Sequence, residues 1–256
     1  MTTLVEFKND WETLAERDAL WAILTDGSKV GGKWDVAEFM ATGEAEIETV
    51  MNHLASIGRL PDCGGEALDF GCGVGRLTQP LARRFAACVG VDISQQMIQK
   101  AEAINKYSHC TYVASSEARL PFDDASFSFL YSNIVLQHVP PRYSIEYLRE
   151  FIRVLAPGGV LVFGVQDSLG GLSSLMIRVR QVVRIRSRIK SALGVSAGTM
   201  LMHCLPEKLV RSALGGASIV DIQYTNSAAP NFNGRLDYLE RPPASGYVGK
   251  QYCVVK

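Results

Sequence analysis

The sequence predicts a single α/β domain built around a doubly wound, mostly parallel sheet of seven strands. Three observations support this fold class. The chain has 256 residues, a length that one α/β domain can fill. Short apolar segments alternate with helical patterns, as in parallel strands joined by crossover helices. Residues 160–165 form an uninterrupted apolar run, which is typical of a strand buried on both faces.

The N-terminal segment, residues 1–60, is expected to form a helical cap. Apolar residues at helical spacing predict helices over residues 10–26 and 35–58, with Gly58 as a C-cap. A polar, glycine-rich stretch over residues 25–33 predicts the loop between them.

The segment 61–167 is expected to form the core of the domain. The predicted strands cover residues 67–70, 88–91, 110–113, 127–132 and 160–165. The predicted helices cover residues 76–86, 94–103 and 143–155. Ser94 is a natural N-cap for the second helix, and Pro157-Gly158-Gly159 predicts a turn before the last strand.

The rest of the chain divides into a basic insertion over 168–204, expected to be helical and to act as a lid, and a C-terminal segment over 205–256. The C-terminal segment is predicted to add a helix over 206–214 and strands over 218–224 and 246–255. A loop rather than a helix joins these two strands, so the final strand is expected to be antiparallel.

Charge and hydropathy argue against a nucleic-acid binder, a secreted protein and a membrane-spanning protein. Lys plus Arg and Asp plus Glu number 26 each, which argues against a dedicated nucleic-acid binder. The N-terminal residues carry acids where a signal peptide needs an apolar core, and no uncharged apolar run reaches the ~18 residues of a membrane span. A cytoplasmic protein is expected, and contact with the inner membrane surface stays open. The sequence leaves the oligomeric state open and shows no metal-ligand cluster.

A glycine-rich motif, A-L-D-F-G-C-G-V-G-R-L-T, carries the chemistry. An acid, Asp69, stands two residues before the first glycine, and the spacing is G-x-G-x-G rather than the G-x-G-x-x-G that cradles a pyrophosphate. A second acid, Asp92, ends the next strand about 20 residues on, where a carboxylate accepts hydrogen bonds from ribose hydroxyls. A nucleoside with a cationic amino-acid tail and no phosphate satisfies both acids, and S-adenosylmethionine is such a molecule.

The chain resembles the class I S-adenosylmethionine-dependent methyltransferases, which have a Rossmann-like fold. The resemblance covers residues 60–165 and 202–225. The motifs that carry it are L-D-F-G-C-G-V-G-R-L-T, V-G-V-D-I-S-Q-Q-M-I, L-P-F-D-D-A-S-F-S-F-L-Y-S-N-I-V-L-Q-H-V and L-R-E-F-I-R-V-L-A-P-G-G-V-L-V-F.

The resemblance implies a cofactor site, residue by residue. The methionine moiety is expected to lie against Asp69, Gly71, Cys72 and Gly73, and Arg76 is added to this expected cofactor site. Asp92 is expected to hold the ribose, and Ile93 and Met97 to flank the adenine. The adenine edge and the reacting centre are assigned to Ser116, Glu117, Ala118 and Asn133. The sequence departs from the common pattern at Ser116, where many relatives carry Asp.

Four residues are candidates for acceptor binding: Trp34, Gln137, His138 and His203. A neutral His138 imidazole, just after the fourth strand, is the candidate general base that takes a proton from an acceptor hydroxyl. The alternative is a histidine that only shapes the pocket. Trp34 and Phe39 either close over the cofactor or pack in the core.

The basic insertion has no acid over residues 168–200 and carries a net charge of +6. On a helical wheel, Arg180, Arg184 and Arg188 form one stripe, and like charges at this spacing need a compensating partner. A solvated face, an anionic or lipid-linked acceptor and a membrane surface all fit, and a nucleic acid is the least favoured partner. The segments I-R-V-R and V-R-I-R-S-R-I also alternate with period two, so a strand is an alternative to the helix.

Three functions remain open at this point. The first is methyl transfer to a hydroxyl of a small-molecule, sugar or lipid-linked acceptor. The second is N-methylation of a small amine or phospholipid head group. The third is a non-enzymatic role in which the cofactor fold binds a partner or membrane.

Overall fold

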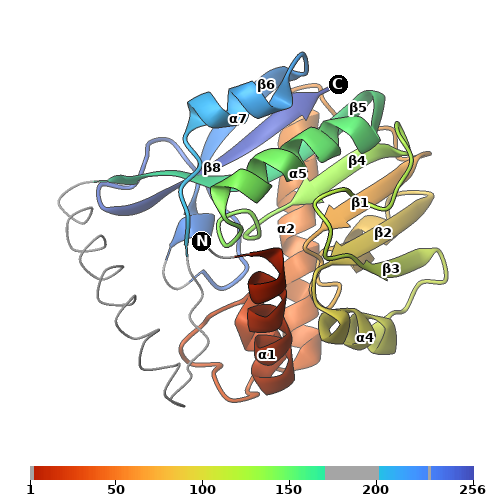
Figure 1. Ribbon diagram of the computed structural model, residues 1–256, viewed down its shortest axis with the longest axis vertical. Coiled ribbons are helices and arrows are strands. Elements are labelled where there is room, and N and C mark those ends of the chain that lie inside the picture. The colour runs from red at the N-terminus through yellow and green to blue at the C-terminus, as the bar shows by residue number, and fades with distance from the viewer. Residues whose placement is uncertain (1–2, 171–201, 230–231) are drawn as a thin grey trace.

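A mixed sheet of eight strands in the order β3-β2-β1-β4-β5-β8-β6-β7 forms the centre of the molecule (Figure 1). The structure is a computed structural model, and it describes residues 3–170, 202–229 and 232–256. The parallel strands are β1 (Glu66–Phe70), β2 (Ala87–Asp92), β3 (Cys110–Ala114), β4 (Phe127–Ser132) and β5 (Leu155–Gly170). The antiparallel part consists of β6 (Ser218–Thr225), β7 (Tyr238–Leu239) and β8 (Gly246–Val255).

The predicted fold class is confirmed, and the strand count differs by one. Strand β7 has only two residues and pairs with β6 at the sheet edge. So short a strand leaves no alternation in the sequence to detect. The expected antiparallel final strand is confirmed, because β8 lies between β5 and β6 and runs against both. Strand β5 also extends further than predicted, to Gly170.

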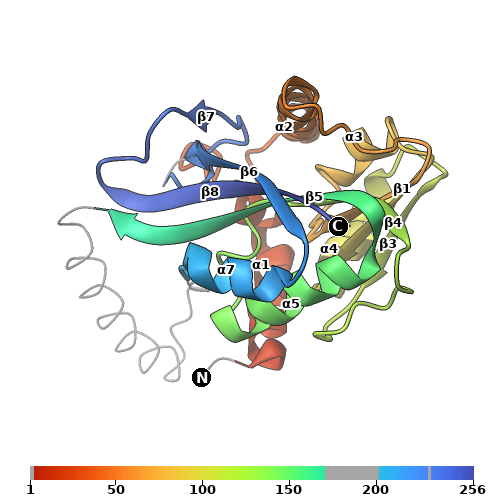
Figure 2. The same cartoon turned by 90° about the horizontal axis from the view of Figure 1, so that it is seen from above.

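Helices cover both faces of the sheet (Figure 2). Helices α2 (Val36–Ser56) and α3 (Thr78–Ala82) share one apolar cluster with the sheet residues Ala67, Phe129 and Val162. Helices α5 (Pro141–Val154) and α7 (Glu207–Leu214) share a second cluster on the other face. This two-sided burial explains why the middle strands are apolar on both faces.

The cap forms a third apolar cluster with α4 (Gln95–Ile104). Its first helix, α1 (Leu4–Ile23), begins six residues before the predicted start, because Thr3 and Glu6 form a capping box. A break at Asp18 interrupts the helix, and the Asp18 carboxylate accepts hydrogen bonds from the backbone of Gly31 and Gly32 at 2.8 Å. The break therefore ties α1 to the following loop.

Several predicted helix ends are found as expected. The Ser94 hydroxyl accepts a hydrogen bond from Met97 N and caps α4. Gly58, at φ +66°, follows α2, and the Arg59 N–H donates to the Leu54 carbonyl, so the helix ends in a Schellman motif.

The predicted helix over 76–86 is wrong in extent, since α3 covers only Thr78–Ala82. Pro80 has no N–H to donate to the Arg76 carbonyl, and its ring would clash there, so the helix cannot start at Arg76. The predicted turn at Pro157-Gly158-Gly159 lies within β5, at the point where the pairing of β5 with β4 shifts register, and Gly158 has φ +77°.

Candidate functional site

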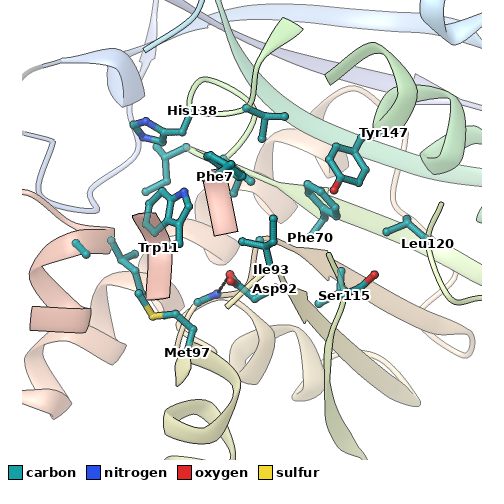
Figure 3. A pocket seen from close by; sticks show the side chains of 18 residues that line it. Phe7, Trp11, Phe70, Asp92, Ile93, Met97, Ser115, Leu120, His138 and Tyr147 are labelled. Carbon is teal, nitrogen blue, oxygen red and sulfur yellow. Dashed lines mark hydrogen bonds between the residues drawn. The ribbon is translucent and has the colours of Figure 1, made fainter. Parts of the chain in front are cut away.

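A pocket lies at the carboxyl ends of β1, β2 and β4, beside α1 (Figure 3). The strand order reverses between β1 and β4, and open α/β sheets bind ligands at such a switch point. The pocket and the solvent-open space at its mouth together comprise about 750 Å³. Its lining residues are Phe7, Trp11, Ala22, Ile23, Phe70, Gly71, Gly73, Val91, Asp92, Ile93, Met97, Ser115, Leu120, Ile134, Val135, His138, Val139 and Tyr147.

The glycine loop forms the base of this pocket. Gly71 and Gly73 have φ of +76° and +52°, a region that side-chain-bearing residues avoid. A Cβ on Gly71 would lie 2.4 Å from Val135 Cγ2, so the loop has no room for a side chain there. The Gly71 N–H donates to the Val91 carbonyl at 2.7 Å, which holds the loop against the end of β2.

Asp92 ends β2 and faces the pocket (Figure 3). Its Oδ2 accepts from Gly73 N at 2.8 Å and its Oδ1 accepts from Ser94 N at 2.9 Å. Burial raises the pKa of Asp92 to about 6 despite these two hydrogen bonds. A carboxylate has about four lone-pair sites, so each oxygen retains capacity to accept from a ligand hydroxyl.

Asp69 lies behind the glycine loop rather than in the pocket lining, and it is buried. Thr78 Oγ1 donates to its Oδ2 at 2.7 Å, whereas Oδ1 has no hydrogen-bond partner among the described residues. Burial raises the pKa of Asp69 to about 7. An unpartnered buried carboxylate oxygen is costly and favours a nearby cation.

An aromatic wall, formed by Phe7 and Trp11 of α1 together with His138, borders the same pocket (Figure 3). The Trp11 ring lies edge-on to the rings of Phe7 and His138, with centroids 6.2 and 5.7 Å apart. Sequence reasoning missed Phe7 and Trp11. Their spacing of four residues was a signal, but it is equally typical of a helix face that packs in a core.

Glu12 fixes the position of α1 over the pocket. Its carboxylate accepts hydrogen bonds from Ser94 Oγ, Gln95 N and Gln96 N at 2.9, 2.8 and 3.2 Å. An acid at the N-terminus of α4 also meets the positive end of the helix dipole. This contact holds the N-terminal helix next to the strand end that carries Asp92.

The structure brings together some of the residues predicted for the cofactor and separates others. Gly71, Gly73, Asp92, Ile93 and Met97 line the pocket. Other predicted residues are absent from the lining and lie behind or beside it: Asp69, Cys72, Arg76, Asn133, Ser116, Glu117 and Ala118. Ser115, one position before the predicted Ser116, lines the pocket instead. The Tyr147 hydroxyl donates to the Glu117 carbonyl at 3.2 Å, which places that loop beside α5.

Some of the residues predicted to bind the acceptor lie at the pocket, and others lie away from it. His138 lines the pocket, and Gln137 Nε2 lies 3.2 Å from His138 Nε2. The backbone N–H of His203 donates to the Gln137 carbonyl at 2.7 Å, so His203 is near this loop. Trp34 is buried instead against Phe39, and its indole N–H donates to the Leu24 carbonyl, which favours core packing. Arg180, Arg184 and Arg188 lie outside the described residues.

The residues present fit S-adenosylmethionine. The glycine loop leaves room for close approach, Asp92 offers acceptor capacity for two ribose hydroxyls, and Ile93 and Met97 offer an apolar surface for the base. Asp69 does not line the pocket, so this fit rests on the glycine loop, Asp92, Ile93 and Met97. Within the described ranges, no three His, Cys, Asp or Glu side chains are grouped to hold a metal ion, and no helix is long and apolar enough to cross a bilayer.

Comparisons with known proteins agree with this fit. A family model described as a methyltransferase domain matches residues 68–163. A trans-aconitate 2-methyltransferase of Afipia carboxidovorans is 28% identical over 64% of this chain and 62% of its own length. A 27-O-demethylrifamycin SV methyltransferase of Amycolatopsis mediterranei is 31% identical over 59% of this chain and 57% of its own length. The chain therefore matches less than two thirds of the length of these relatives.

A solved methyltransferase structure has a similar fold. Magnesium protoporphyrin IX methyltransferase from Synechocystis PCC 6803, with bound SAH, aligns with a TM-score of 0.61 at 18% identity. The alignment covers 99% of this chain and 100% of that protein.

Proposed function

We propose that this chain, which belongs to the class I S-adenosylmethionine-dependent methyltransferases, transfers a methyl group to a hydroxyl of an apolar small-molecule acceptor. The observation that carries the proposal is the pocket lining. The glycine loop and Asp92 provide a polar side suited to the cofactor, and the aromatic wall borders the same space.

The residues of the pocket have two tasks in this reaction. Bound S-adenosylmethionine supplies an activated methyl group and its own leaving group, so the protein needs no covalent intermediate. The protein must align the acceptor with that methyl group and accept the proton that the hydroxyl loses. His138 lines the pocket and is the proposed general base. Its basic ring nitrogen must not be engaged by the Gln137 amide, which lies 3.2 Å from Nε2, when it takes the proton of the acceptor hydroxyl.

The lining also supports an apolar acceptor over a free sugar. Among the described residues that line the pocket, the titratable side chains are Asp92, His138 and Tyr147, and burial raises the pKa of the Tyr147 phenol to about 12. The rings of Phe7 and Trp11 offer an extended apolar surface to an acceptor. A lipid-linked acceptor remains within this proposal, because its apolar part suits the same surface.

Transfer of labelled methyl groups from S-adenosylmethionine to a host extract tests the proposal. The extract is separated afterwards into lipid, glycan, small-molecule, protein and nucleic-acid fractions. We expect the label in an apolar small-molecule or lipid product, with the new bond on oxygen by mass spectrometry and NMR. Label confined to protein or nucleic acid contradicts the proposed acceptor class. Cofactor binding without transfer to any fraction favours the non-enzymatic reading.

The variant His138→Asn separates O-methylation from N-methylation of an amine. Loss of a general base lowers the turnover number by about 100-fold or more, whereas cofactor affinity stays unchanged. Turnover equal to the wild type would favour an amine acceptor that needs no base, or a pocket-shaping role for His138. Flotation with vesicles that contain or lack anionic lipid tests the membrane contact that the sequence leaves open for the basic insertion, and binding must weaken at high salt if such a contact is electrostatic.

A further inference from the structure

A carboxylate of the cap, Glu46 on α2, is fully buried with 0% of its surface exposed. Its Oε2 accepts from Arg76 Nη2 at 2.8 Å. Its Oε1 accepts from the Tyr131 hydroxyl and from Asn133 Nδ2, each at 2.8 Å. One acid thus joins the cap helix to the glycine loop and to the end of β4.

This arrangement is costly if its purpose is stability alone. Removing two charges from water carries a penalty that their attraction often fails to repay, and apolar residues of similar volume frequently give equal or greater stability. Arg76 is 2% exposed and its Nε has no partner among the described residues, so the pair is not even fully hydrogen-bonded. The pair is therefore better explained by what it positions.

Both ends of the network reach segments that border the cofactor pocket. Arg76 follows Gly75 directly and forms the exit of the glycine loop. The α2 backbone touches it there, since a Cβ on Gly43 would lie 2.0 Å from the Arg76 carbonyl oxygen. Asn133 follows the last residue of β4 and directly precedes Ile134 and Val135, which line the pocket.

The same network continues away from the pocket to the antiparallel half of the sheet. Gln251 Nε2 of β8 donates to the Tyr131 hydroxyl at 3.4 Å, and the Tyr238 hydroxyl of β7 donates to Gln251 Oε1 at 2.7 Å. The Tyr131 hydroxyl donates to Glu46 Oε1 and accepts from Gln251 Nε2, so hydrogen bonds on both sides fix its orientation. Glu46 accordingly holds its partners in one arrangement.

From these contacts we propose that Glu46 is a positioning residue of the cofactor site. Its hydrogen bonds fix Arg76 at the glycine-loop exit and Asn133 at the end of β4, and thereby hold the two backbone segments that face the cofactor. The cap helix then determines cofactor affinity through one buried charge and not only through its packing. This role is independent of which acceptor receives the methyl group.

Binding of S-adenosylhomocysteine to variants, measured by isothermal titration calorimetry, tests the inference without any acceptor. For Glu46→Gln we expect affinity to fall by about tenfold or more, the effect of losing a hydrogen bond to a charged group. Glu44→Gln is the matched control. Glu44 lies on the same helix and pairs with Arg83 at 3.1 Å, but both side chains of that pair are more than half exposed. Its affinity should equal that of the wild type.

The double variant Glu46→Leu/Arg76→Met separates positioning from stability. An apolar pair should restore the melting temperature to near the wild-type value, because it removes both buried charges. The affinity should nevertheless stay at least about tenfold low, because Asn133 and Tyr131 have lost their common acceptor. A double variant that regains both the melting temperature and the affinity overturns the inference, as does unchanged affinity in Glu46→Gln.

Hydrogen exchange provides a second readout for the same variants. In Glu46→Gln, amides of the glycine loop over 71–75 and of residues 133–135 should exchange faster, while those of α5 keep their protection. Uniformly faster exchange across the sheet would indicate a purely structural role and would also overturn the inference.

Discussion

The stability of the cofactor-free protein should fall as pH rises from 4 to 8, and Asp69 should be a principal cause. Its carboxyl is buried behind the glycine loop with one oxygen unpartnered, and its pKa is raised from 3.8 to about 7. Between these two values the folded protein holds a proton that the unfolded chain has released. The free energy of unfolding is therefore highest below the unfolded pKa and is lost as pH rises through the folded pKa.

The size of the effect follows from the difference in pKa. About three pKa units at 1.36 kcal/mol each correspond to about 4 kcal/mol lost between pH 4 and pH 8. Such a loss is a large part of the stability of a typical domain.

Urea unfolding at a series of pH values measures the effect, with Asp69→Asn as the reference. The variant retains an oxygen that accepts from Thr78 but cannot ionise, so the difference in unfolding free energy between the two proteins isolates the carboxyl. We expect Asp69→Asn to be the more stable protein at pH 8 without cofactor. Equal pH slopes in the two proteins would refute the reasoning.

Two further predictions concern the loop and the cap. Gly71→Ala should abolish measurable cofactor binding in calorimetry, because a Cβ there would lie 2.4 Å from Val135 Cγ2. The control is Gly158→Ala, at nearly the same φ of +77° but with nothing within 4 Å of the added Cβ. It should cost only about 1–2 kcal/mol of stability and leave cofactor binding unchanged. Glu12→Gln should lower stability by about 1 kcal/mol and speed cofactor dissociation in stopped-flow experiments, because it weakens the contact that holds α1 at the N-terminus of α4. The control is Glu16→Gln, since Glu16 is exposed on the same helix. Equal dissociation rates in the two variants would contradict the role of α1.

Local patterns predicted most strands of the sheet, in its parallel and in its antiparallel part. Strand β4 runs from Phe127 to Ser132 and β8 from Gly246 to Val255, as the apolar runs indicated. Ser94 caps α4 because its hydroxyl satisfies a local donor, and such contacts depend on a few neighbouring residues. The predicted start of the helix after the glycine loop at residue 76 overlooked a signal that is also local, since Pro80 has no N–H to donate to the Arg76 carbonyl.

The candidate site was predictable where it follows the motifs and not where it depends on tertiary packing. Gly71 in the glycine loop and Asp92 at the end of β2 both line the pocket, and the motifs placed both residues correctly on these elements. Trp11 lines the pocket only because Glu12 attaches α1 to α4, a contact 82 residues apart in the chain. Glu46 is a similar case, because an acid within an amphipathic helix looks like an exposed residue until its partners are known.

The position of β8 has a consequence for synthesis of the protein on the ribosome. This strand fills the space between β5 and β6, and it follows both of them in the chain, so it is translated after them. While the residues of β8 are still being translated, the facing edges of β5 and β6 have no partner, and unpaired strand edges invite pairing with other chains. The nascent protein can thus assemble its glycine loop and first five strands early, but it must wait for residues 246–255 before the sheet is continuous.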